Sequence, residues 1–115
     1  MTQLAEASAV SEMIRGILAE LRRRFEALYG DRLAKLILYG SQARGDYRWW
    51  SDIDVMVVLE GPVDVITEMN RTEEISGDVS LKNDAVVLGM FAGQETLQHD
   101  SWPLFDSVRT EGVEF

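Results

Sequence analysis

Two short apolar runs constrain the fold of this chain more than any other feature of its sequence. Residues 33–39 read LAKLILY and residues 53–59 read IDVMVVL. A strand with nearly continuous apolar residues is typical of a sheet that is covered on both faces. The sequence therefore predicts that both runs are strands of a sheet flanked by helices.

The segments around these two runs supply the remaining predicted elements. Residues 11–29 place apolar side chains at the spacing of one helix face, and the glycine and aspartate that follow are a suitable helix stop. Proline at 62 and at 103 suits the first turn of a helix. We expect further elements over residues 62–76 (helix), 77–83 (turn), 85–91 (strand) and 94–112 (two helices).

Chain length and composition fit one compact domain over residues 1–115. The chain has 115 residues, of which 46% are hydrophobic, enough for a single core. The element order predicts a layered α/β (α+β) domain with a small mixed sheet. No apolar run approaches the roughly 20 residues that span a bilayer. Without a signal peptide or any cysteine, a cytoplasmic location is the expectation.

The charge balance indicates which partners to expect. The formal net charge is −9, whereas proteins that bind nucleic acid usually present a basic surface. A nucleic-acid substrate is therefore not expected. An acidic surface would instead favour association with a basic protein.

Two aspartates at the start of the second predicted strand are candidate metal ligands. Asp52 and Asp54 are two positions apart, so in a strand they lie on the same face, roughly 7 Å apart. Two such carboxylates can hold a divalent ion, and oxygen ligands without cysteine favour magnesium. The alternative is a strand edge that ends in two solvated acids.

A second candidate site lies at the end of the first predicted strand. Gly40 would let the backbone approach a ligand closely, and a helix beginning at Ser41 would direct free amides towards an anion such as a triphosphate. The alternative is a simple tight turn. Arg44 could bind phosphate or could pair with Asp46 as a loop brace.

These residues together resemble a known family. Gly40-Ser41, a gap of ten residues, and Asp52-x-Asp54 resemble the signature of the DNA polymerase beta nucleotidyltransferase superfamily. The longer sequence pattern Gly-Ser-x-Ala-Arg-Gly with Ser-Asp-Ile-Asp is similar to the pattern of the minimal nucleotidyltransferase branch of this superfamily. The resemblance implies that Gly40 and Ser41 bind the triphosphate of ATP and that Asp52 and Asp54 hold Mg²⁺.

The resemblance also implies a third carboxylate on a neighbouring strand, which completes the metal site and helps to deprotonate the acceptor hydroxyl. Asp84, expected at the start of the third strand, is the first choice for this catalytic and metal-binding role. Asp78 is the rival, although the neighbouring Gly77 indicates a turn. Three converging acids would favour an enzyme, and two without a third would favour a binding module.

The family resemblance suggests the acceptor as well. Minimal nucleotidyltransferases resemble the antitoxins of toxin–antitoxin pairs, in which AMP is added to a tyrosine of a small helical HEPN partner. The first hypothesis is thus AMP transfer from ATP to a HEPN-like partner protein, with a homo-oligomer as another possible context. The alternatives are a catalytically silent nucleotide-binding antitoxin and transfer to a small molecule.

Two further features carry weaker hypotheses. Trp49 and Trp50 could stack on a base, form a partner surface or pack the loop. His99, the single histidine, is expected at the surface rather than in catalysis.

Overall fold

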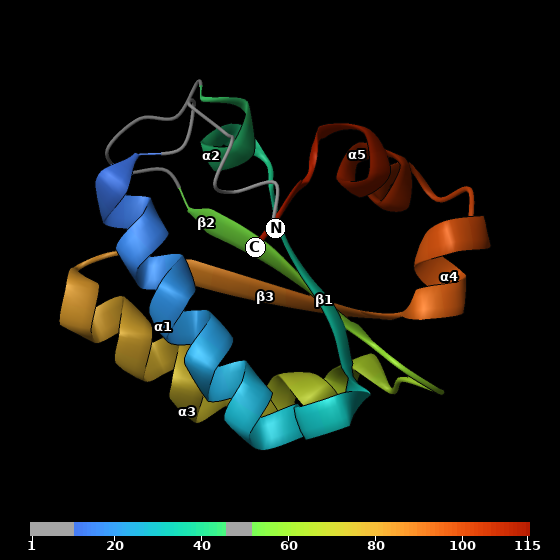
Figure 1. Ribbon diagram of the computed structural model, residues 1–115, viewed down its shortest axis with the longest axis horizontal. Helices are drawn as coiled ribbons and strands as arrows, with labels where there is room; N and C mark the ends of the chain where they lie inside the picture. Colours follow the sequence, from blue (N-terminus) through green and yellow to red (C-terminus); the bar gives the residue numbers. More distant parts are fainter. Residues whose placement is uncertain (1–10, 46–51) are drawn as a thin grey trace.

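The computed structural model describes residues 11–45 and 52–115, which form a four-stranded mixed sheet with helices on both faces (Figure 1). The strand order is β3-β2-β1-β4; β1 runs antiparallel to β2 and β4, and β2 runs parallel to β3. The elements in chain order are α1 (Glu12–Tyr29), the 3-10 turn η2 (Gly30–Arg32), β1 (Leu33–Tyr39), α2 (Ser41–Arg44), β2 (Ile53–Leu59), α3 (Val65–Asn83), β3 (Val87–Gly93), α4 (Gln94–His99), α5 (Pro103–Glu111) and β4 (Val113–Glu114).

The alternation of side chains along β2 explains why its sequence is apolar throughout. Val55 and Val57 point to the face covered by α1 and α3, whereas Met56 and Val58 join the smaller core under α4 and α5. All four side chains are buried. Both predicted central strands are therefore confirmed, as is the mixed sheet between two helical layers.

Helix α1 forms as its apolar spacing predicts. Its N-cap Ser11 accepts a hydrogen bond from the amide of Ile14 at 3.3 Å, and the helix ends at Tyr29 with Gly30, whose φ is +56°, as its C-cap. One face is buried against the sheet and α3, and the buried residues are Ile14, Ile17, Leu18, Leu21 and Phe25. In the described ranges, no helix combines the length and the apolar character needed to cross a bilayer.

The turn predicted over residues 77–83 is wrong, because α3 continues through it to Asn83. The reason is tertiary packing, which outweighs the weak helix propensity of glycine and serine. Val79 is fully buried under α1 and the sheet, and Asp78 pairs with Arg24 of α1. The helix also begins later than predicted, at Val65, with Asp64 as its N-cap.

The third strand accordingly begins at Val87 and extends to Gly93. The two predicted C-terminal helices are confirmed as α4 and α5. The short strand β4, which was not predicted, pairs with β1 and brings the buried Phe115 into the main core.

A buried carboxylate ties together the helical layer formed by α1, η2 and α3. Glu68 is 3% exposed; it accepts a hydrogen bond from the Tyr29 hydroxyl at 2.7 Å and pairs with Arg71 at 2.9 Å and Arg32 at 3.5 Å. Burial opposes its ionisation, but the hydrogen bonds from Tyr29 and Arg71 and the nearby positive charges outweigh burial. The pKa of Glu68 therefore lies below its ordinary value.

Candidate functional site

The candidate site lies where β2 begins, on the face of the sheet opposite α1 and α3. Asp54 is half-buried there and lies opposite Tyr39 of β1, while Asp52 is exposed just before the strand. Burial raises the pKa of Asp54, the charge of Asp52 raises it further, and Arg44 lowers it. The structure therefore brings Asp52, Asp54 and Arg44 within electrostatic reach of one another.

Gly40 brings the backbone against the Asp54 carboxylate. Its φ of +75° and ψ of −158° lie in a region that is essentially open to glycine alone. A Cβ atom at this position would lie 2.5 Å from Oδ2 of Asp54. The predicted close approach of a glycine backbone is thus present, and its immediate neighbour is a proposed metal ligand.

The short helix α2 follows directly from this turn. The amides of Ala43 and Arg44 donate to the carbonyl of Gly40 at 3.1 and 3.2 Å, and Gly45 ends the helix with a φ of +80°. Ser41 is the first residue of α2, so the helix predicted to begin there is present. Gly40 and Ser41 follow Tyr39 directly, and Tyr39 pairs with Asp54 across β1 and β2, so both residues stand close to Asp54.

Arg44 has a partner that sequence reasoning missed. Its Nη1 lies 3.1 Å from Oε2 of Glu111 on α5. The two residues are 67 positions apart, and nothing in the sequence indicates that they meet. Asp46, the alternative partner, lies outside the described residues, as do Trp49 and Trp50.

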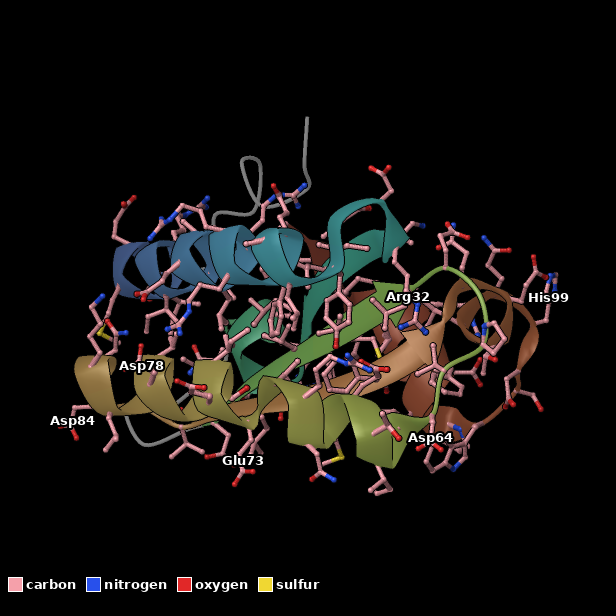
Figure 2. The ribbon with its side chains drawn as sticks, turned by 90° about the horizontal axis from the view of Figure 1, so that it is seen from below. Arg32, Asp64, Glu73, Asp78, Asp84 and His99 are labelled. Atoms are coloured by element: carbon pink, nitrogen blue, oxygen red, sulfur yellow. The ribbon has the colours of Figure 1, made fainter. Side chains whose placement is uncertain are left out.

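Asp84 does not occupy the start of the third strand, and this prediction is corrected. It ends α3 in a left-handed conformation with a φ of +49°, three residues before β3 begins. Figure 2 shows it at the end of α3, directed away from the body of the protein. Across the described ranges, no three histidine, aspartate or glutamate side chains form a group that could hold a metal ion.

Asp78, the rival candidate, is also far from this role. It lies on α3 on the side that faces α1, where it pairs with Arg24 (Figure 2). Within the described part of the chain, the aspartate pair therefore stands without the third acid that the family resemblance implies.

The strand β3 presents apolar residues to the aspartate pair. Leu88 lies opposite Asp54 in the parallel register, and the Val86 carbonyl accepts a hydrogen bond from the Ile53 amide at 2.8 Å. Leu88 is 46% exposed and Val86 is 50% exposed. The position on β3 next to Asp54 thus carries a leucine, which sequence reasoning did not single out.

The aspartate pair fits a magnesium ion by its donor chemistry. Mg²⁺ is usually bound in proteins by one or two carboxylates together with substrate phosphates and water. The negative charge of Asp52 lies close enough to Asp54 to raise the pKa of the Asp54 carboxyl, and a pair of carboxylates this close favours a bound cation. Asp52 and Asp54 are the residues that would hold it.

His99 lies far from this site, as expected of a surface residue. It is exposed at the end of α4, and its Nε2 is 3.5 Å from a carboxylate oxygen of Glu95 on the same helix. Figure 2 places His99 and Asp84 at opposite ends of the molecule.

Comparison with known proteins identifies the family of this chain. The Nucleotidyltransferase domain family matches residues 16–98. Two relatives from Methanocaldococcus jannaschii are named as candidate protein adenylyltransferases. One is 30% identical over 98 residues (85% of this chain and 94% of the relative), and the other is 33% identical over 94 residues (81% and 88%).

The fold also matches a solved structure. A chain in the crystal structure of a toxin–antitoxin with AMP-PNP superimposes with a TM-score of 0.57 and 22% identity, covering 81% of this chain and 68% of that one. At this identity the likeness shows the shared fold. The family match over most of the chain and the two relatives establish that the chain is a member of the nucleotidyltransferase domain family, and thus a nucleotidyltransferase.

Proposed function

We propose that this nucleotidyltransferase moves AMP from ATP to a hydroxyl group of a partner protein, in a magnesium-dependent reaction. The observation that carries the proposal is the pair formed by Asp52 and Asp54, in which the Asp54 carboxylate lies against the Gly40 turn. The relatives named as candidate protein adenylyltransferases support both the nucleotide and the protein acceptor.

The residues of the site have separate roles in this proposal. Asp52 and Asp54 hold the magnesium ion, and Gly40 and Ser41 bind the triphosphate. Arg44 adds a positive charge for the phosphates, since its guanidinium group matches phosphate oxygens well. Bound magnesium supplies positive charge that stabilises the triphosphate and the leaving pyrophosphate.

The transfer itself exchanges one phosphate bond for another. The acceptor oxygen attacks the α-phosphorus of ATP and forms a new P–O bond. The bond from that phosphorus to the oxygen that bridges to the β-phosphate breaks, and pyrophosphate leaves with the bonding electron pair. The hydroxyl proton passes to solvent, so the protein's contribution is positioning and charge stabilisation.

The proposed acceptor is a tyrosine of a HEPN-like partner. A phenol has a pKa of about 10, far below that of an alkyl hydroxyl, so it needs less help from a general base. This suits a site in which the described residues contribute two carboxylates and no third. A toxin–antitoxin assembly among the structural neighbours supports a protein partner.

A second candidate function is favoured by the same observation. With two acids beside Gly40 and no third in the described residues, the chain could bind ATP and neutralise its partner without chemistry. The two functions differ in a single outcome, which is the appearance of covalent label on the partner.

The deciding experiment uses ATP labelled at the α-phosphate, with magnesium and purified HEPN-like candidate partners. The proposal expects label on a tyrosine and release of pyrophosphate. Asp54→Asn should lose the transfer, whereas Asp84→Asn should keep it, because Asp84 lies away from the site. Magnesium-dependent ATP binding with no label on any partner supports the catalytically silent nucleotide-binding antitoxin. Label on a small molecule supports transfer to a small-molecule acceptor.

A further inference from the structure

We propose that the outer edge of β3 binds an extended, basic segment of the acceptor protein as an added strand, and so presents its hydroxyl to Asp52 and Asp54. This inference rests on the proposed function for the role of the segment. The surface, called here the β3 edge, consists of β3 (Val87–Gly93) and the groove between it and α3.

The strand β3 lies at one end of the sheet order among the described residues, so its outer backbone groups have no neighbouring strand. The carbonyl of Val86 bonds to β2, and in a parallel ladder the backbone groups of alternate residues point the same way. The backbone N–H and C=O groups of Val87, Gly89 and Phe91 therefore point to the open edge. The Ser80 hydroxyl accepts a hydrogen bond from the Val87 amide at 3.0 Å. The backbone groups of Gly89 and Phe91 are then the ones that would pair with an incoming strand.

The sequence of β3 has none of the usual protection of an edge strand. Natural edge strands carry charged residues, proline or bulges that prevent pairing with another chain. Residues 87–93 read VLGMFAG, without a charge or a proline, and they pair with β2 in unbroken register. An unprotected edge of this kind is suited to strand addition by a partner.

A groove runs beside this edge and has room for an extended chain. It encloses 620 Å³ between α3 and β3. Small residues on both walls leave its middle open, and an added Cβ at Gly77 would meet no atom within 4 Å. Residues that line it include Met69, Glu73, Ser76, Gly77, Leu88 and Gly89.

The β3 edge lies one strand away from the candidate site. Leu88 lines the groove and also lies opposite Asp54 in the register, so only β3 separates a segment on the edge from the strand of Asp54, a distance of about 10 Å between strand axes. The exposed side chains of Leu88 and Val86 offer apolar contact to the acceptor residue. A tyrosine ring fits this requirement, because it is apolar except for the hydroxyl that reacts.

The charge of the groove indicates a basic occupant. Glu73 is the charged side chain among the lining residues, it is exposed, and Figure 2 shows it on the side of α3 turned away from α1. The whole chain carries a net charge of −9. A segment in which basic residues alternate with apolar ones would match both the charge and the two-residue period of a strand.

The test uses an eight-residue peptide in which lysines alternate with valines and one central valine is replaced by tyrosine. Three further peptides serve as controls: one has phenylalanine in place of tyrosine, one has glutamate in place of lysine, and one has proline at alternate positions. Amide hydrogen exchange of Gly89 and Phe91 reports strand addition directly, and labelled ATP reports transfer.

Two glycine substitutions form a matched pair. Gly77→Trp fills the groove from α3, and Gly16→Trp makes the same change on α1; both glycines are exposed within helices, and an added Cβ meets no atom within 4 Å at either. Neither change should impair folding, because glycine is among the poorest helix formers.

We expect the tyrosine and phenylalanine peptides to slow exchange at Gly89 and Phe91 at least tenfold in the wild type and in Gly16→Trp. Gly77→Trp should abolish this protection while its ATP binding is unchanged. The inference is overturned if the peptides still slow exchange at Gly89 and Phe91 in Gly77→Trp. It is also overturned if the lysine peptides do not slow this exchange in the wild type. Protection that rises with protein concentration alone shows a second copy at the edge and also overturns it. Protection without label on the tyrosine peptide counts against the proposed function instead and leaves strand addition intact.

Discussion

Gly40→Ala tests the contact on which the candidate site depends, and Gly61→Ala provides a matched control. Both glycines have positive φ, at +75° and +79°. A Cβ at Gly40 meets Oδ2 of Asp54 at 2.5 Å, whereas a Cβ at Gly61 meets no atom within 4 Å. Gly61 follows the far end of β2, about 20 Å from Asp54. The two variants therefore share backbone strain but differ in their effect on the site.

The size of both effects can be worked from this geometry. A non-glycine residue in such a conformation costs roughly 1–3 kcal/mol. For a domain of this size, each 1 kcal/mol lowers the melting temperature by about 4 °C. Both variants should thus melt about 4–12 °C lower than the wild type. The shortest comfortable carbon–oxygen contact is about 3.3 Å, whereas the added Cβ would lie 2.5 Å from Oδ2 of Asp54. In Gly40→Ala this oxygen must therefore move by roughly 0.8 Å.

A displacement of this size should weaken magnesium-dependent ATP binding in Gly40→Ala by about 10- to 100-fold, the usual cost of disturbing the groups that orient a metal ligand. Isothermal titration calorimetry with ATP and magnesium measures the affinity, and thermal unfolding by circular dichroism measures stability. Gly61→Ala should bind as the wild type does. Equal weakening in both variants, or unchanged binding in a folded Gly40→Ala protein, would refute the role given to Gly40 and Asp54.

Three further predictions concern stability and nucleotide binding. Glu68→Gln should destabilise the fold by about 2 kcal/mol at neutral pH, because it weakens the contacts to Tyr29 and Arg71, and exposed Glu73→Gln should not. Since the pKa of Glu68 is lowered in the folded state, its stabilisation is present above the ordinary glutamate pKa of about 4.3 and is lost as pH falls through the lower folded value. The difference between wild type and Glu68→Gln in urea denaturation should therefore shrink below about pH 4, and a constant difference would contradict it. Gly112→Ala should lower the free energy of unfolding by about 1–3 kcal/mol in the same assay, because the added Cβ would collide with Ile37 and the Val108 carbonyl. A variant as stable as the wild type would show that α5 can shift to make room. Arg44→Gln should weaken ATP binding about tenfold or more, while Glu111→Gln, which removes the charge of its partner, should not; equal weakening would assign Arg44 to bracing α5.

Local sequence was sufficient for the elements whose signals lie within a few residues. The apolar runs of β1 and β2 and the one-sided face of α1 predict their structures correctly, because burial on one or both faces dictates these patterns. The same holds for the placement of Asp52 and Asp54 at the start of β2. The conformation required of Gly40 also follows from its place between a strand and a helix.

Only the tertiary structure decided how far α3 extends and what faces the aspartate pair. Residues 77–83 have the composition of a turn, but burial of Val79 and the contact of Asp78 with Arg24 keep them helical. That extension places Asp84 at a helix end and shifts the start of β3 to Val87.

The register of β2 and β3 then sets Leu88 beside Asp54. A parallel pair is joined by a long crossover, so no turn geometry fixes its register, which depends on how α3 packs against the sheet. The sequence alone therefore determined which residues could carry the chemistry. Packing across the crossover decided which of them meet, because it fixes the relative position of strands that local signals leave free.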